Sequence, residues 1–292
     1  MRQKKTDFVD IILGIIMVII TIAAVYPLYY IYINSLSGGA YVGANEVILY
    51  PKGVTTYAYS LALQNSSIVR SFVNSVFYTV AGTLLSVILS AFCAYPLSRK
   101  EFYGRKIFTA IIMFTMFFNG GIIPLFLTIT DLHLYNTIWA ILLPSCISVY
   151  NVIVMRTFFQ SISYELTESA YIDGANDWVV FGKIILPLSK PILATMILFY
   201  GVANWNSFYN ALMFLNEKAL YPLQLVLRTI VIEGSTTEMA YMASSEGSLS
   251  VPIDTKSIKY AVVAVTTLPM IIVYPFVFKY FEKGVMIGSV KG

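Results

Sequence analysis

Six long stretches of this sequence contain no Asp, Glu, Lys or Arg, and each is long enough to cross the apolar core of a membrane as a helix. With 58% hydrophobic residues, 12% charged residues and a mean hydropathy of +0.75, the chain cannot bury its apolar side chains in one water-soluble core. The sequence therefore predicts an all-α membrane protein, a single transmembrane domain over residues 1–292. The expected spans are 11–33, 73–97, 107–130, 134–155, 191–216 and 260–278.

Six spans place both termini on one side, and the basic residues indicate which side that is. The segments on the side of the termini hold 13 of the 19 Lys and Arg residues, and the segments on the other side hold 6. Since short basic loops stay cytoplasmic, we expect the termini and the 98–106 and 156–190 loops in the cytoplasm, and the 34–70 and 217–259 loops outside. The net charge of +4 then reflects membrane orientation, and it predicts no nucleic-acid surface.

The first apolar stretch also begins like a signal peptide, after a basic N-terminus. It is longer than a signal core and ends in an aromatic belt at 26–30, so we expect an uncleaved span. Cys93 and Cys146 both fall inside expected spans, where small buried side chains are expected rather than a disulfide or a metal pair.

Several kinds of chemistry are excluded by what the sequence lacks. It has no Gly-rich loop ending in Lys-Ser or Lys-Thr, so we expect no ATP hydrolysis by this chain and no catalytic site. The single histidine, His133, has no neighbouring Cys or His, so no metal site is expected. No ionisable residue lies in the middle of a span, which argues against a proton relay and favours a path for a neutral, hydroxyl-bearing solute.

The 156–190 loop has the pattern of a short helical hairpin. Ser163 can cap a helix that runs to Asp173, and Gly174 can end it. A second helix can begin at Asn176 or Asp177. Its apolar residues recur at near-helical spacing and can pack onto the membrane domain until Pro187 turns the chain toward the next span; they are Trp178, Phe181 and Ile185.

One side of this hairpin carries small residues beside a carboxylate. Ser169, Ala170, Gly174 and Ala175 would let a partner's backbone approach closely, and Glu168 offers a negative charge to it. A capped surface helix without any partner would show the same residues. The residue types alone leave both interpretations open.

The spacing resembles the cytoplasmic signature of the inner-membrane subunits of binding-protein-dependent ABC importers. That signature reads Glu-Ala-Ala, three residues, Gly, nine residues, Ile, one residue, Leu-Pro. This chain has Glu168-Ser169-Ala170, then Gly174, then Ile184, Leu186 and Pro187, and departs only in Ser169. Further segments are similar to the carbohydrate branch, on the side of the smaller maltose-type permease and nearest to the Gram-positive subgroup for complex oligosaccharides. These segments are 74–75, 94–99, 120–124, 205–206 and 283–292.

The resemblance implies a type I ABC importer permease fold in the bacterial cytoplasmic membrane. It implies a second permease subunit as heterodimer partner, two ATPase subunits that bind the ATP and Mg, and an extracytoplasmic sugar-binding protein; no cofactor is expected on this chain. The implied ATPase-coupling residues are Glu168, Ser169, Ala170, Asp173, Gly174 and Ala175. A tail that reaches between the ATPases is implied at Ser289, Lys291 and Gly292, where a frayed end is the alternative.

A sugar path needs amides and hydroxyls, together with aromatic faces on which pyranose rings stack. The fifth expected span combines them, and Asn119 in the third span is a weaker candidate of the same kind. The same amides could instead tie helices together. The predicted path residues are Asn119, Asn204, Trp205, Asn206, Tyr209 and Asn210.

Both outer loops are candidates for contact with a binding protein, and either could be only a lid or a spacer. Two alternatives to a sugar importer are kept. The first is an importer of the same architecture for another solute; if that solute is charged, its path needs side chains of opposite charge. The second is a secondary transporter, which would need inverted internal repeats and ionisable residues near the middle of the membrane.

Overall fold

A computed structural model describes the backbone of residues 8–232 and 255–289, and the side chains of 8–231 and 256–275. All regular structure in these residues is helical, as the sequence predicts. The chain divides into two compact units: unit 1 comprises residues 1–69 and 227–268, and unit 2 comprises 70–226 and 269–292. Each unit is described by itself.

Three single helices in the described residues are long and apolar enough to cross a membrane. They lie in α1 (Phe8–Ser35), α4 (Ser66–Ser98) and α16 (Thr255–Ser289). The side chains of α1 are exposed from residue 8 to residue 29, although nearly all of them are apolar. An apolar face of this size requires lipid or another apolar surface around it, because water would not solvate it.

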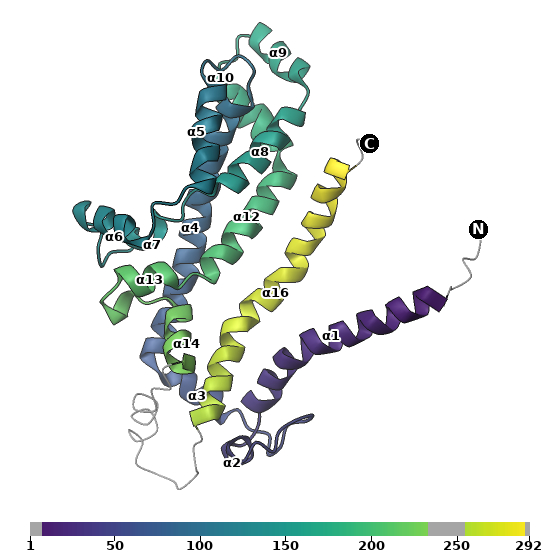
Figure 1. Cartoon of the computed structure of the whole chain (residues 1–292), viewed down its shortest axis with the longest axis vertical. Helices are drawn as coiled ribbons and strands as arrows, with labels where there is room; N and C mark the ends of the chain where they lie inside the picture. Colours follow the sequence, from purple (N-terminus) through teal and green to yellow (C-terminus); the bar gives the residue numbers. More distant parts are fainter. Residues whose placement is uncertain (1–7, 233–254, 290–292) are drawn as a thin grey trace. The chain divides into compact units, whose positions relative to one another are not determined.

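In unit 2, α8 (Val149–Ser161) packs against α5 (Arg105–Phe117) and α12 (Lys190–Trp205), as Figure 1 shows. One hydroxyl connects three of the helices. The Tyr200 hydroxyl lies 2.6 Å from Ser90 Oγ of α4 and accepts the backbone N–H of Ser148, at the start of α8, at 3.0 Å. Fully buried Met155 and Met196 fill the space between α8 and α12.

Three of the expected spans are not continuous helices. The 107–130 stretch divides into α5 and α6 (Ile122–Asp131), which meet at an angle of 115°. Gly121 makes this break possible, because its φ of 90° lies in a region that other residues rarely adopt. The 191–216 stretch divides into α12 and α13 (Tyr209–Phe214), with residues 206–208 between them.

The expected 134–155 span is also divided, into α7 (Trp139–Leu142) and α8, with Pro144 in the connection. α13 packs against α6 and α7, where Phe214 and Ala140 are fully buried. If each strongly bent helix pair counts as one span, the described residues contain up to five candidate spans, including a pair formed by 177–188 and 190–205. The six-span topology stays a prediction.

In unit 1, the segment after α1 packs against the last turns of α1. Ile33 packs with Val42 of α2 (Gly39–Gly43) and with Val47. The Tyr32 hydroxyl lies 3.1 Å from Thr267 Oγ1 of α16. The loop after α1 continues through α3 (Tyr57–Gln64) into α4. This packing gives the 34–70 segment a defined conformation within its unit.

The start of the 217–259 segment is held on α4 by polar side chains. Asn74 donates to the carbonyls of Ala219 and Tyr221 at 2.8 and 3.1 Å, and Ser75 Oγ accepts the N–H of Leu223 at 2.7 Å. These bonds fix the short 3₁₀ helix Lys218–Leu220 and the first turn of α14 (Leu223–Ile232). The outer-loop segment therefore leaves unit 2 from a rigid base.

Asn136 connects two loops of unit 2, and its substitution provides a test of this packing. Its Oδ1 accepts the N–H groups of Asn216 and Glu217, both at 3.0 Å, and its φ of 58° suits Asn better than Ala. We expect Asn136→Ala to lower the free energy of unfolding by about 1–2 kcal/mol. Thermal unfolding of the purified protein in detergent measures this. Asn136→Asp keeps the acceptor oxygen and should unfold near the wild-type temperature; equal losses in both variants would contradict the assigned hydrogen bonds.

Candidate functional site

The predicted hairpin is present and occupies residues 163–188; we call it the loop hairpin. Its first helix is α9 (Tyr164–Ile172), which starts after Ser163 as expected, although the Ser163 side chain does not make the expected cap hydrogen bond. Gly174 has a φ of 83° and ends the helix. The Ala175 N–H donates to the Ala170 carbonyl at 2.9 Å, and the Gly174 N–H donates to the Tyr171 carbonyl at 3.0 Å. This is a Schellman motif, which gives the end of α9 one fixed conformation.

The second arm starts at Asn176, whose side chain accepts the Val179 N–H at 3.0 Å. It continues as α10 (Asp177–Val179), a π-helical segment (Val180–Ile185) and α11 (Leu186–Leu188). The chain then bends by 80° into α12, next to the predicted turn at Pro187. Wide turns of this type are rare inside helices and often occur at functional sites.

Three side chains of the second arm were expected to pack onto the helices, and two of them do. Phe181 is 7% exposed and its ring centroid lies 4.8 Å from that of Tyr95 on α4, while Ile185 is fully buried. Trp178 is 71% exposed, so it meets this expectation only in part. It lies on the outer side of the aromatic cluster, where its ring makes an edge contact with Phe92.

A polar contact holds the first arm as well. Thr167 of α9 is 1% exposed, and its Oγ1 accepts a hydrogen bond from Arg99 Nη1 at 3.0 Å. The Arg99 guanidinium also stacks 4.8 Å above the Tyr95 ring. The sequence analysis did not identify this contact, because Arg99 and Thr167 are far apart in the chain and neither belongs to the recognised signature.

The small residues of the loop hairpin do not all face outward. Ala170 and Ala175 are half-buried and pack against the core, so the interpretation of both as part of an exposed small-residue face is wrong. Glu168, Ser169, Asp173 and Gly174 are exposed. Exposed apolar side chains accompany them, including Leu166 and Ile172, the second of which is 82% exposed.

Glu168 makes no hydrogen bond or ion pair within the part of the chain that the structure describes. The negative charge of Glu101, with a smaller contribution from Glu168, raises the pKa of the Tyr164 phenol. Burial and a hydrogen bond to Asp177 raise the pKa of Tyr171 above its usual range. Both phenols stay neutral at physiological pH, and the exposed carboxyl groups near the end of α9 are those of Glu168 and Asp173, which suit a basic partner.

The predicted path residues lie at two helix breaks of unit 2. Asn204 Nδ2 donates to Thr83 Oγ1 at 3.4 Å, and Asn210 Nδ2 donates to Ser145 Oγ at 2.9 Å. The Asn204 amide therefore connects α12 to α4, which was the alternative interpretation, and the Asn210 amide connects α13 to the loop between α7 and α8. Trp205 is buried against Phe72, and its indole N–H has no partner in the described residues.

The remaining path candidates are exposed. Asn206 and Tyr209 lie on the two sides of the break between α12 and α13. Asn119 lies in the break between α5 and α6, where its Oδ1 accepts the Gly121 N–H at 2.8 Å. Of the predicted tail, Lys291 and Gly292 lie outside the described residues, and Ser289 ends α16 with its side chain outside them.

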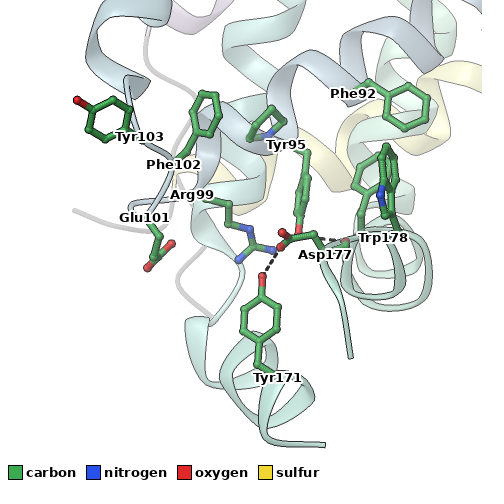
Figure 2. Close-up of a pocket in the computed structure, with 11 residues that line it drawn as sticks. Phe92, Tyr95, Arg99, Glu101, Phe102, Tyr103, Tyr171, Asp177 and Trp178 are labelled. Carbon is green, nitrogen blue, oxygen red and sulfur yellow. Dashed lines mark hydrogen bonds between the residues drawn. The ribbon is translucent and has the colours of Figure 1, made fainter. Parts of the chain in front are cut away.

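A pocket of about 660 Å³ lies between the end of α4 and the loop hairpin (Figure 2). Its walls are mainly aromatic, and Arg99 lies near the middle in this view. No described residues form a group of three or more Asp, Glu, His or Cys side chains that could hold a metal ion. The sequence analysis did not predict this pocket.

The family comparison agrees with the signature in the loop hairpin. The profile of the family described as "Binding-protein-dependent transport system inner membrane component" matches residues 82–287. The chain therefore belongs to this family of membrane transport components.

Similar proteins come from Bacillus subtilis (strain 168). The polygalacturonan/rhamnogalacturonan transport system permease protein YtcP is 39% identical over 99% of this chain and all of that protein. Protein LplC is 40% identical over 92% of this chain and 90% of that protein. Among solved structures, a bacterial ABC transporter involved in the import of the acidic polysaccharide alginate has a chain that is 33% identical, with a TM-score of 0.88 over 96% of this chain and 99% of that chain.

Gly174 provides a test of the fixed hairpin geometry. A Cβ at this position would meet no atom within 4 Å, so Gly174→Ala is strained only by the positive φ, at a cost of about 1 kcal/mol. We expect the amides of residues 174 and 175 to exchange hydrogen about fivefold faster in the variant, measured by mass spectrometry. Gly182→Ala, in the helical second arm and equally open, should leave these rates unchanged. Unchanged exchange in Gly174→Ala would contradict the Schellman motif.

Proposed function

We propose that this chain is the transmembrane subunit of an ATP-driven importer of a sugar or oligosaccharide that an extracytoplasmic binding protein delivers. Family membership supports the importer role, and the saccharide names of its relatives support the substrate class. A second permease subunit and two ATPase subunits complete the importer. The ATPases bind ATP and Mg, and this chain contributes no catalytic site.

The topology that goes with this function has six spans in one transmembrane domain, with both termini and the 156–190 loop in the cytoplasm. The excess of Lys and Arg in the short loops of that side supports it. The 34–70 and 217–259 segments then face the binding protein outside. The hydrogen bonds of Asn74 support this role for the 217–259 segment, because they hold the start of the segment on α4.

The observation that carries the proposal is the shape of the loop hairpin. Its arms are fixed to the core through Phe181, Ile185 and Thr167, while Glu168 and its neighbours are exposed. A partner that engages the exposed side can therefore move the helices behind it. We assign the ATPase contact to Glu168, Ser169, Asp173 and Gly174, with Ala170 and Ala175 as packing positions, and a second ATPase contact to the tail.

The solute path is proposed at the helix breaks. A break leaves backbone groups without helical partners, which is tolerated at membrane depth where the backbone lines a cavity or is buried in protein. Asn119, Asn206 and Tyr209 are exposed there and available to hydroxyl groups of a sugar, while Asn204 and Asn210 shape the path through their bonds to Thr83 and Ser145. Trp205 contributes an aromatic wall, and its indole N–H has no hydrogen-bond partner among the residues that the structure describes.

A charge reversal tests the coupling role. Glu168→Lys places a positive charge where the exposed carboxylate is proposed to meet a basic partner, so we expect uptake of the labelled saccharide to fall roughly tenfold or more. The membrane level of the protein should stay normal. Glu165→Lys changes the same charge on the same helix, one turn away from the signature, and should retain most of the uptake. Normal uptake in Glu168→Lys would contradict the coupling role.

Side-specific labelling tests the orientation. In a chain whose Cys93 and Cys146 are replaced by Ser, Ile172→Cys should react with an impermeant maleimide only from the cytoplasmic side. Tyr50→Cys, in the 34–70 segment and at a side chain that is 64% exposed, should react only from outside. Labelling of both positions from one side would contradict the proposed topology.

A further inference from the structure

The pocket beside the loop hairpin is not needed to explain coupling or the solute path. Seven lining residues come from the end of α4 and the loop after it and four from the loop hairpin, and Phe92 lies beside Trp178 of the hairpin in Figure 2. Phe92, Tyr95 and Phe181 form a packed wall, with ring centroids 4.8–5.4 Å apart for the pairs that include Phe181. Two further rings are exposed at its edge: Trp178 at 71% and Tyr103 at 97%. Exposed rings beside a defined pocket are available to a ligand.

Arg99 supplies a positive charge without a matching acceptor. Its Nη1 donates to Thr167, but its Nε and Nη2 are buried and have no hydrogen-bond partner in the described residues. No carboxylate of the described chain forms an ion pair with it. A buried donor without an acceptor costs about 1–3 kcal/mol, so a shift of the Arg99 side chain that pairs these atoms with a ligand carboxylate is favoured.

The other polar groups suit hydroxyls. Asp177 lies at the start of α10, and its Oδ1 accepts from the Tyr171 hydroxyl at 2.5 Å, which leaves its second oxygen available. The exposed carboxylate of Glu101 also lines the pocket. The pocket therefore offers three kinds of contact to an acidic saccharide. Aromatic faces can stack on pyranose rings, carboxylates can accept hydrogen bonds from sugar hydroxyls, and one cation can pair with an acid group.

We propose that this pocket binds an acidic saccharide of about two pyranose units, with a uronate carboxylate at Arg99 and ring faces against Trp178 and Tyr103. The volume of about 660 Å³ lies within the usual range for small-ligand sites. The assignment rests on the proposed function for its saccharide class, and two similar transport proteins are named for polygalacturonan/rhamnogalacturonan and for the acidic polysaccharide alginate.

The position of the pocket gives such binding a consequence. α4 is uncharged from residue 73 to residue 97, so Arg99 is the first cation that follows this stretch. A ligand between Arg99 on one side and Asp177 and Trp178 on the other connects the end of α4 to the loop hairpin. It adds a contact to the attachment that already joins the two, so a bound saccharide strengthens the connection through which the hairpin moves α4.

The test uses the complete purified importer in nanodiscs of phosphatidylcholine, with digalacturonate as the probe and galactobiose as its neutral match. We expect digalacturonate to change the tryptophan fluorescence with saturation and to bind at least tenfold more tightly than galactobiose. Trp178→Phe should remove the signal, and Trp139→Phe should keep it. Equal binding of both sugars, or a signal that persists in Trp178→Phe, would overturn the proposal.

Calorimetry on further variants identifies the contacts. Arg99→Gln should remove the preference for digalacturonate, and Tyr103→Ala, at an exposed ring, should weaken binding at least fivefold without loss of folding. Tyr150→Ala, at an exposed ring outside the pocket, should bind as the wild type does. The same titration in nanodiscs of phosphatidylglycerol tests whether anionic lipid headgroups occupy the pocket. If digalacturonate no longer binds there, the pocket is a lipid site and the proposal is overturned. If the wild-type importer takes up saccharides but this pocket binds none, only this inference fails; if it takes up none, the proposed function fails.

Discussion

The attachment of the loop hairpin to the end of α4 is the constraint on which the rest of the account depends. Buried Phe181 and Ile185 fix the second arm, and the hydrogen bond from Arg99 to Thr167 fixes the first. Coupling between distant sites travels through packed and hydrogen-bonded elements of this kind. Without them, a force applied at Glu168 would move only the hairpin, and the helices that line the path would stay in place.

The second constraint is the cost of unpaired backbone groups in a membrane. α1 is one continuous helix that pairs most of its backbone groups internally and can expose its side chains to lipid, whereas the α5–α6 and α12–α13 pairs are interrupted. These interruptions bring polar side chains such as Asn206 and Asn119 to places where a continuous helix would present an apolar surface. The break that weakens a helix therefore also provides polar groups that can bind a solute.

Local chemistry made part of the structure predictable. The start of α9 after Ser163, the turn at Gly174 and the start of the second helix at Asp177 follow from neighbouring residues, and the structure confirms them. The apolar stretches predicted helices, but their breaks depend on which backbone groups find partners in the folded chain. The contact of Arg99 with Thr167 joins positions far apart in the sequence, and the exposure of Trp178 depends on how the arm rotates, so periodicity alone could not predict either.

The measurement that tests the central claim most directly is solute uptake by reconstituted vesicles that contain this chain, its partner permease and the binding protein, with and without the ATPase subunits. The account predicts uptake only when the ATPases and hydrolysable ATP are both present, because only the ATPases can move the loop hairpin. Uptake at the same rate in vesicles that lack the ATPase subunits would contradict it.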